Sequence, residues 1–141
     1  HQLGGDTMKW KRTNFSTGTK WEPIAGYSRA VKIGPFIHVS GTTSTDEEGF
    51  ILHKHDPYLQ TIQCLKNIES ILKNADVSLK DIIRTRIYVT NINDWEKIAK
   101  AHAEYFKVIM PATSMVEVSG LISPDIVVEI EAEAIKGDDN D

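Results

Sequence analysis

The sequence is short of three features that would mark other classes of protein. It has a single cysteine, Cys64, so no internal disulfide can form, and a reducing compartment is favoured. No apolar run approaches the ~20 residues of a membrane-spanning helix. Basic residues do not outnumber acidic ones, since 16 Lys and Arg stand against 20 Asp and Glu. We therefore expect a cytoplasmic protein without a membrane partner and without the basic patch of a nucleic-acid-binding protein.

The length and composition fit one ordinary domain. The chain has 141 residues, of which 40% are hydrophobic, which is enough for a single core. We expect the natural chain to begin at Met8, with residues 1–7 as a remnant of expression, and the domain to cover residues 8–136. The acidic residues 137–141 are expected to form a flexible tail.

Hydrophobic periodicity predicts strands and two long helices. Helices are predicted over residues 55–76, with Asp56 as N-cap before Pro57, and over 93–109, with Asn93 and Glu96 spaced as a capping box. Strands are predicted in "RAVKIGPFIHVSG", where two meet at Gly34-Pro35, and over residues 81–90, 113–119 and 126–135. The order predicts an α+β domain, with two helices on one face of a mainly antiparallel or mixed sheet.

Alternation assigns the two faces of that sheet. The residues expected to face the helices are Ile83, Thr85, Ile87, Val89, Ser114, Val116 and Val118. The residues expected on the other face are Arg84, Arg86, Tyr88, Thr113, Met115, Glu117, Glu129, Glu131 and Glu133. That second face is either solvated or a subunit interface.

Other candidate sites are weaker. His53, His55 and Asp56 lie close together but lack a third ligand at a convincing spacing, and Asp56 is needed as a cap, so no metal site is expected. Trp95 and His102 fall on the apolar stripe of the second helix, and a core position suits His102. Cys64 is expected to be a buried small residue rather than a nucleophile.

Four stretches together resemble the Rid (reactive intermediate deaminase) family, also called the YjgF family. They are "GYSRAVKIGPFIHVSG", "YLQTIQCLKNIESILKNADVSLKDIIRTRIYVTNINDW", "PATSMVEV" and "VEIEAEAI", in family order. The resemblance implies a chorismate-mutase-like α+β fold, assembled as a homotrimer with ligand clefts between subunits. It also implies hydrolysis of reactive enamines and imines to 2-oxo acids and ammonia, without a metal or organic cofactor.

The resemblance also implies site residues. The family's cleft tyrosine falls on Tyr27, its Ser-Gly strand end on Ser40 and Gly41, and the glutamate that positions water on Glu129. Where the deaminases carry a carboxylate-binding arginine, this sequence has Thr113, followed by Ser114, and a cleft asparagine falls near Ala99. Standard 2-imino acid deamination is therefore in doubt unless another cation serves. Arg86 is the first candidate, before Arg84 and Arg29; the alternative is that these arginines pair with Glu117, Glu129 or Glu131.

The sequence leaves three hypotheses about function open. The first is a hydrolase acting on a small enamine or imine, with Glu129 as the residue that places water and Tyr27, Ser40, Gly41 and Thr113 as the cleft. The second is a non-catalytic homotrimer that binds a small ligand. The third is a nucleic-acid-linked role, against which the acidic balance of the chain argues.

Overall fold

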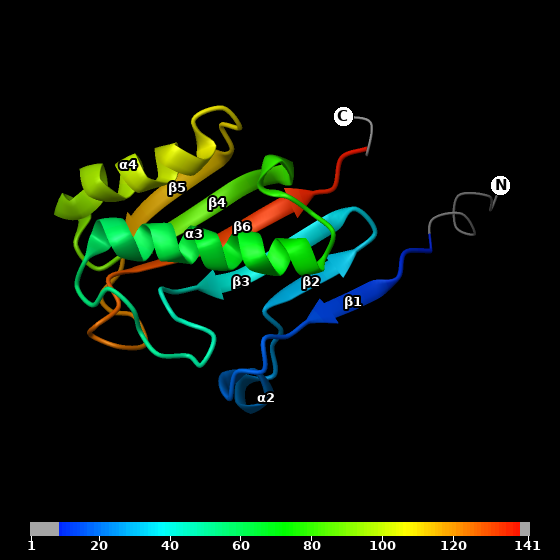
Figure 1. Ribbon diagram of the computed structural model, residues 1–141, viewed down its shortest axis with the longest axis horizontal. Coiled ribbons are helices and arrows are strands. Elements are labelled where there is room, and N and C mark those ends of the chain that lie inside the picture. The colour runs from blue at the N-terminus through cyan, green and yellow to red at the C-terminus, as the bar shows by residue number, and fades with distance from the viewer. Residues whose placement is uncertain (1–8, 139–141) are drawn as a thin grey trace.

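The computed structural model describes residues 9–138. The predicted start at Met8, the remnant before it and the last residues of the tail lie outside this range. Six strands form one sheet in the order β1-β2-β3-β6-β4-β5 (Figure 1). The strands are β1 (Arg12–Phe15), β2 (Ala30–Ile33), β3 (Phe36–Thr42), β4 (Ile82–Val89), β5 (Ala112–Glu117) and β6 (Val128–Ile135).

The sheet is mixed, as predicted. Every neighbouring pair is antiparallel except β4 and β5, which run parallel because α4 connects them. The turn between β2 and β3 falls at Gly34-Pro35, where Gly34 has a φ of 58°. Strand β1, at the sheet edge, was not predicted from the sequence.

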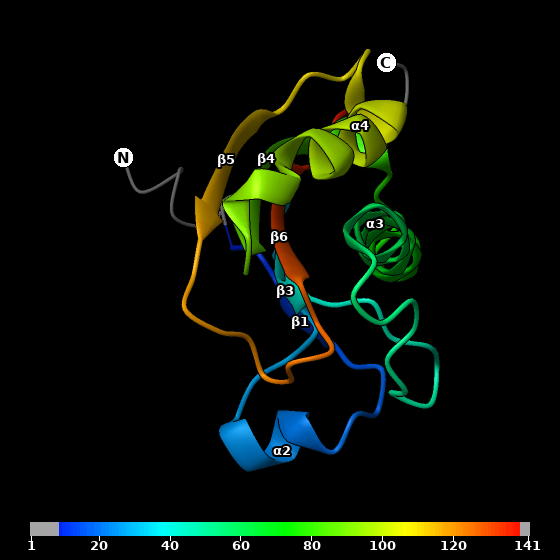
Figure 2. The same ribbon diagram turned by 90° about the vertical axis from the view of Figure 1, so that its left-hand side faces the viewer.

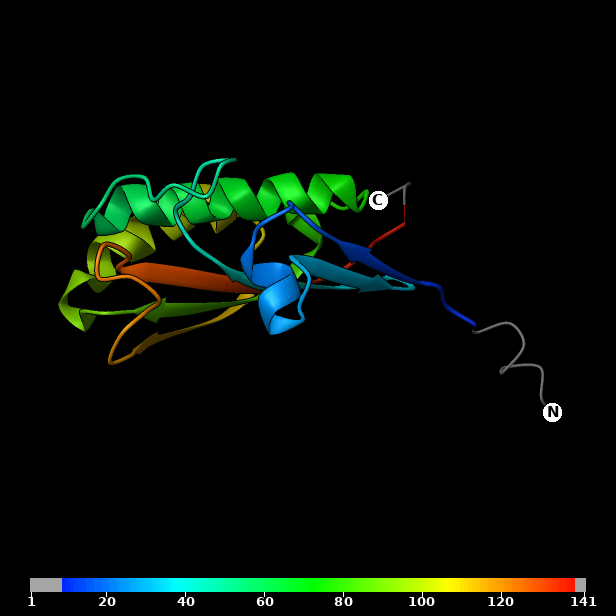
Figure 3. The same cartoon turned by 90° about the horizontal axis from the view of Figure 1, so that it is seen from below.

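Two long helices cover one face of the sheet and leave the other without a long helix (Figures 2 and 3). They are α3 (Pro57–Asn74) and α4 (Trp95–Phe106). This confirms the predicted α+β arrangement. A short helix, α2 (Trp21–Ala25), lies at one end of the sheet and was not predicted; two 3-10 turns, Leu79–Asp81 and Ile92–Asp94, precede β4 and α4. No helix among the described residues is long and apolar enough to cross a membrane.

The two helix starts differ from each other. Asp56 caps α3 as predicted, because its carboxylate accepts a hydrogen bond of 2.9 Å from the backbone N–H of Leu59. The capping box predicted at Asn93 and Glu96 is wrong. Residues 92–94 form a 3-10 turn instead, and the side chain of Asn91 accepts from the N–H of Asn93.

The core lies between the helices and the sheet. Cys64 is fully buried within it, as expected, and burial raises the pKa of its thiol. Trp95, placed on the apolar stripe by periodicity, is 52% exposed instead, because α4 begins there at the edge of the helix layer. The largest fully buried apolar side chains come from both layers: Ile37, Leu65, Ile68, Leu72, Ile87, Val89, Ile98, Val128 and Ile130.

The predicted orientation is wrong for Ile83 at the start of β4 and for β5, whereas Thr85, Ile87 and Val89 of β4 face the helices as predicted. An irregular register near the start of β4 turns Ile82 into the core and leaves Ile83 48% exposed. In β5, parallel pairing sets Thr113 beside Thr85 and Met115 beside Ile87, so these residues face the helices. Apolar residues occur on both sides of this edge strand, so alternation alone could not orient it.

Candidate functional site

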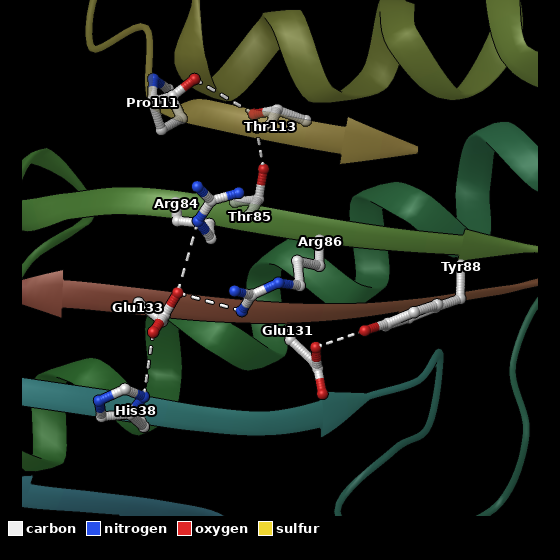
Figure 4. A network of polar contacts seen from close by, with 9 residues as sticks. All are labelled: His38, Arg84, Thr85, Arg86, Tyr88, Pro111, Thr113, Glu131 and Glu133. Carbon is white, nitrogen blue, oxygen red and sulfur yellow. Dashed lines mark hydrogen bonds and ion pairs between the residues drawn. The ribbon is translucent and has the colours of Figure 1, made fainter. Parts of the chain in front are cut away.

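The face of the sheet that the long helices leave uncovered carries a band of charged residues (Figure 4). The carboxylate of Glu133 lies close to three basic side chains. Its oxygens are 3.0 Å from Arg86 Nη1, 3.6 Å from Arg84 Nε and 3.3 Å from His38 Nδ1. Arg86, the first candidate for a ligand-binding cation, is therefore engaged in an ion pair within the sheet. Arg84 and Arg86 are thus paired with a glutamate, but that glutamate is Glu133 and none of the expected Glu117, Glu129 and Glu131.

Glu131 is also engaged on this face. Its carboxylate accepts a hydrogen bond of 2.7 Å from the Tyr88 hydroxyl, and this bond, with burial, raises the pKa of Tyr88. Two of the three outward glutamates of β6 thus have protein partners, and they hold β6 to β4.

Glu129 differs from its two neighbours. Among residues 9–138 it has no hydrogen bond or ion pair, although its side chain is only partly exposed. Burial raises the pKa of its carboxyl; Arg29 opposes the shift and Glu131 adds to it. Glu129 is therefore a carboxylate whose proton affinity is increased and whose oxygens are available to water or a ligand.

A β-bulge in β3 places Gly41 under this carboxylate. The register between β3 and β6 shifts between Val39 and Thr42, which leaves Ser40 and Gly41 at the irregularity. A Cβ on Gly41 would lie 2.0 Å from Glu129 Oε2, so only glycine lets the carboxylate occupy its position. Ser40 anchors the bulge by donating a hydrogen bond of 2.6 Å to the Ser28 carbonyl.

Arg29 and Tyr27 complete this cluster. Arg29 Nη2 donates a hydrogen bond of 2.6 Å to the Gly41 carbonyl, and its guanidinium carbon lies 5.6 Å from the centre of the Tyr27 ring. A hollow of about 590 Å³ opens beside Tyr27 and Ser40, with Arg12 and Asn14 from β1 on its wall. We call Tyr27, Arg29, Gly41 and Glu129 the glutamate cluster.

Thr113 lies on the opposite face of the sheet from Glu129. Its hydroxyl is 2.8 Å from that of the buried Thr85, which is 2.9 Å from His102 Nε2 on α4. Burial lowers the pKa of His102, so the imidazole at the end of this chain is favoured in its neutral form. Thr113 also donates to the Pro111 carbonyl at 3.2 Å (Figure 4).

The structure thus divides the residues predicted for the site. Tyr27, Ser40, Gly41 and Glu129 come together around the bulge. Arg86 lies in the band of ion pairs on the open face, and Ser114 of β5 is paired beside Arg86. Thr113, the residue before Ser114, faces the helices. Arg29 is only the third of the three arginines that the sequence offers as a ligand-binding cation. The signal for it was its position two residues after Tyr27, which places both side chains on the same side of an extended segment.

The weak metal candidate among the histidines finds a different explanation. His55 Nε2 pairs with Asp125 at 3.2 Å, and Asp56 caps α3. Across the described part of the chain, no group of three His, Cys, Asp or Glu side chains is arranged to hold a metal ion.

Comparisons with known proteins agree on one family. The protein-family model described as endoribonuclease L-PSP matches residues 17–136 of this chain. The 3-aminoacrylate deaminase RutC of Acinetobacter baylyi is 38% identical over 112 residues, 79% of this chain and 88% of that protein. The crystal structure of Rv2704 from Mycobacterium tuberculosis, a member of the YjgF/YER057c/UK114 family, has a TM-score of 0.81 at 46% identity, covering 89% of this chain and 99% of that one. The crystal structure of E. coli TdcF with bound serine has a TM-score of 0.72 at 29% identity. The match covers 79% of this chain and 88% of the TdcF chain.

Proposed function

The chain belongs to the YjgF/Rid family, and from this premise we propose that it hydrolyses a small reactive enamine or imine to a carbonyl compound and ammonia. The observation that carries the proposal is Glu129, a partly buried carboxylate of raised pKa beside Gly41. The Gly41 carbonyl accepts a hydrogen bond from Arg29, whose guanidinium lies near the Tyr27 ring. The relative named as a 3-aminoacrylate deaminase supports the same substrate class.

The proposed reaction is an imine hydrolysis, for which the enamine first tautomerises. Glu129 accepts a proton from a water molecule as the water oxygen bonds to the imine carbon. The protonated Glu129 returns that proton to the imine nitrogen, which gives a carbinolamine. Glu129 then moves the proton of the new hydroxyl group to the amino nitrogen, the C–N bond breaks, ammonia leaves and a carbonyl remains. A carboxyl whose pKa is raised suits these proton transfers better than an ordinary surface glutamate does, because its pKa lies closer to neutral pH.

We propose a homotrimer as the working assembly. Its support is the face opposite the two long helices, where ion pairs lie beside exposed apolar side chains such as Ile33 and Val116. Thr113 and Glu129 lie on opposite faces of one sheet, so Thr113 joins the glutamate cluster only when a second copy brings it there. Sedimentation at micromolar concentration tests the assembly, and a single monomeric species would contradict it.

The alternative is a homotrimer that binds a small ligand without turning it over. The threonine at position 113 favours it, because its single neutral hydroxyl cannot bind a carboxylate with two charge-assisted hydrogen bonds as an arginine does. The endoribonuclease description belongs to the family model; the acidic side chains of β6 on the open face give no basis for carrying it to this chain.

A coupled assay separates the two functions. The protein is added to a serine or threonine dehydratase, and release of the 2-oxo acid is followed. We expect faster release with the natural protein, and a loss of about a hundredfold or more of that acceleration in Glu129→Gln, which keeps the shape but cannot take a proton. Glu96→Gln, which removes an exposed carboxylate in the first turn of α4, is the matched control and should retain it. No acceleration at high protein concentration would leave the ligand-binding function.

A further inference from the structure

The arginines near the open face of the sheet differ in whether a carboxylate neutralises them. Arg84 and Arg86 both lie within 4 Å of Glu133. Arg29 has no carboxylate within 4 Å among the described residues, although it lies near Glu129. Its positive charge is therefore only partly compensated within the protomer.

The guanidinium of Arg29 is held in place on two sides. Nη2 donates to the Gly41 carbonyl at 2.6 Å, and the Tyr27 ring lies against the group at 5.6 Å. Within residues 9–138 this is the only hydrogen bond of the side chain, so its remaining N–H donors have no protein acceptor. A fixed guanidinium with free donors is arranged to bind an oxyanion with two parallel hydrogen bonds.

Gly41 joins this cation to the proposed catalytic carboxylate. Arg29 contacts the carbonyl of Gly41, and the carboxylate of Glu129 packs against its Cα. The two charged groups therefore both contact Gly41 without forming an ion pair with each other. A planar ligand with an anionic group next to its reacting carbon could contact both groups at once.

We propose that Arg29, rather than Arg84 or Arg86, is the residue of this chain that binds an anionic carboxylate of the ligand. The proposal rests on the proposed function for the identity of the reacting group. A monoanionic carboxylate fits better than a phosphate, because the neighbouring Glu129 and Glu131 repel a dianion more strongly. Arg29 takes the role of the cation that the sequence lacks at position 113.

Binding of a matched pair of stable probes tests the proposal. Pyruvate and its neutral amide, pyruvamide, are titrated into the natural protein and followed by NMR. We expect pyruvate to bind at least tenfold more tightly, and Arg29→Gln to remove most of that preference while leaving pyruvamide binding unchanged. Arg86→Gln, which also removes a cation near this face, is the matched control and should keep it. An unchanged preference in Arg29→Gln would overturn the proposal.

A second measurement needs no variant, in case loss of the bond to Gly41 prevents folding. With arginine labelled by ¹⁵N, pyruvate should shift the side-chain N–H signals of Arg29 and leave those of Arg86 in place. A shift of Arg86 instead, or of neither residue, would contradict the assignment. Binding that depends on Arg29 without turnover would overturn the hydrolase function alone. Turnover that is insensitive to Arg29→Gln would overturn the carboxylate site alone.

Discussion

The hydroxyl oxygen of Thr113 lies 2.8 Å from that of Thr85, and this contact joins the edge strand β5 to the interior of the protein. Thr85 is fully buried and continues the chain to His102 on α4. A threonine that the family resemblance placed in a ligand cleft is thus, in the protomer, the outer end of a buried polar chain. Its first role is to fasten β5 beside β4.

The two threonines of this hydrogen-bonded chain should differ in their effect on stability. Thr85→Val removes the partner of a partly buried imidazole, and we expect it to lower the free energy of unfolding by about 1–3 kcal/mol. Thr113→Val should cost less than ~1 kcal/mol, because Thr113 is exposed and Thr85 keeps its bond to His102. Urea unfolding measures both. Equal losses would show that the two threonines do not stand in this order.

Replacing Gly41 by alanine should affect activity more than folding. The new Cβ would displace the end of the Glu129 side chain, which is flexible, so we expect the free energy of unfolding to change by less than ~1 kcal/mol. The displaced carboxylate would no longer sit beside Arg29, and 2-oxo acid release should fall by about tenfold or more. Gly120→Ala is the matched control, because a Cβ there meets nothing within 4 Å. Full activity in Gly41→Ala would argue against the placement of Glu129.

The raised pKa of Glu129 predicts a pH dependence of stability. The folded state holds this proton more tightly than the unfolded chain, in which the glutamate has its ordinary pKa of 4.5. The resulting stabilisation is fully present below that value and is lost as the pH rises through the folded pKa. Glu129→Gln lacks it, so the free energy of unfolding of the natural protein minus that of the variant should fall across this window.

Urea unfolding of both proteins between about pH 4 and about pH 8 measures that difference, in which the titrating groups that do not interact with Glu129 cancel. A difference that rises with pH would mean that Arg29 outweighs burial and lowers the pKa of Glu129. A constant difference would mean that the two effects balance.

Cys64 should be inert in the native protein. The thiol is fully buried, and burial raises its pKa, so the reactive thiolate is scarce and a reagent cannot reach it. We expect Ellman's reagent to modify no thiol under native conditions and one per chain in strong denaturant. Rapid native labelling would show that α3 opens readily from the sheet.

The sequence predicted the elements whose periodicity is strong. The apolar stripe of α3 and the alternation in β6 each repeat over many residues, so local sequence determines their type and buried face. The cap at Asp56 was predicted from a different local signal, an aspartate directly before Pro57. Elements that depend on distant partners escaped prediction. Strand β1 has four residues and is stabilised by pairing with β2, and the start of α4 moved because Asn91 made a tighter turn before it.

The same division holds for the candidate site. Tyr27, Ser40, Gly41 and Glu129 were identified from sequence because they stand in recognisable stretches. The partners of the three arginines were decided only by tertiary structure, since an arginine's partner depends on which strands become neighbours. The order β3-β6-β4 gives Arg84 and Arg86 to Glu133, and the bulge in β3 turns the Gly41 carbonyl toward Arg29. Sequence alone determined which groups are present; strand order and register decided which charges neutralise one another and which remain available to a ligand.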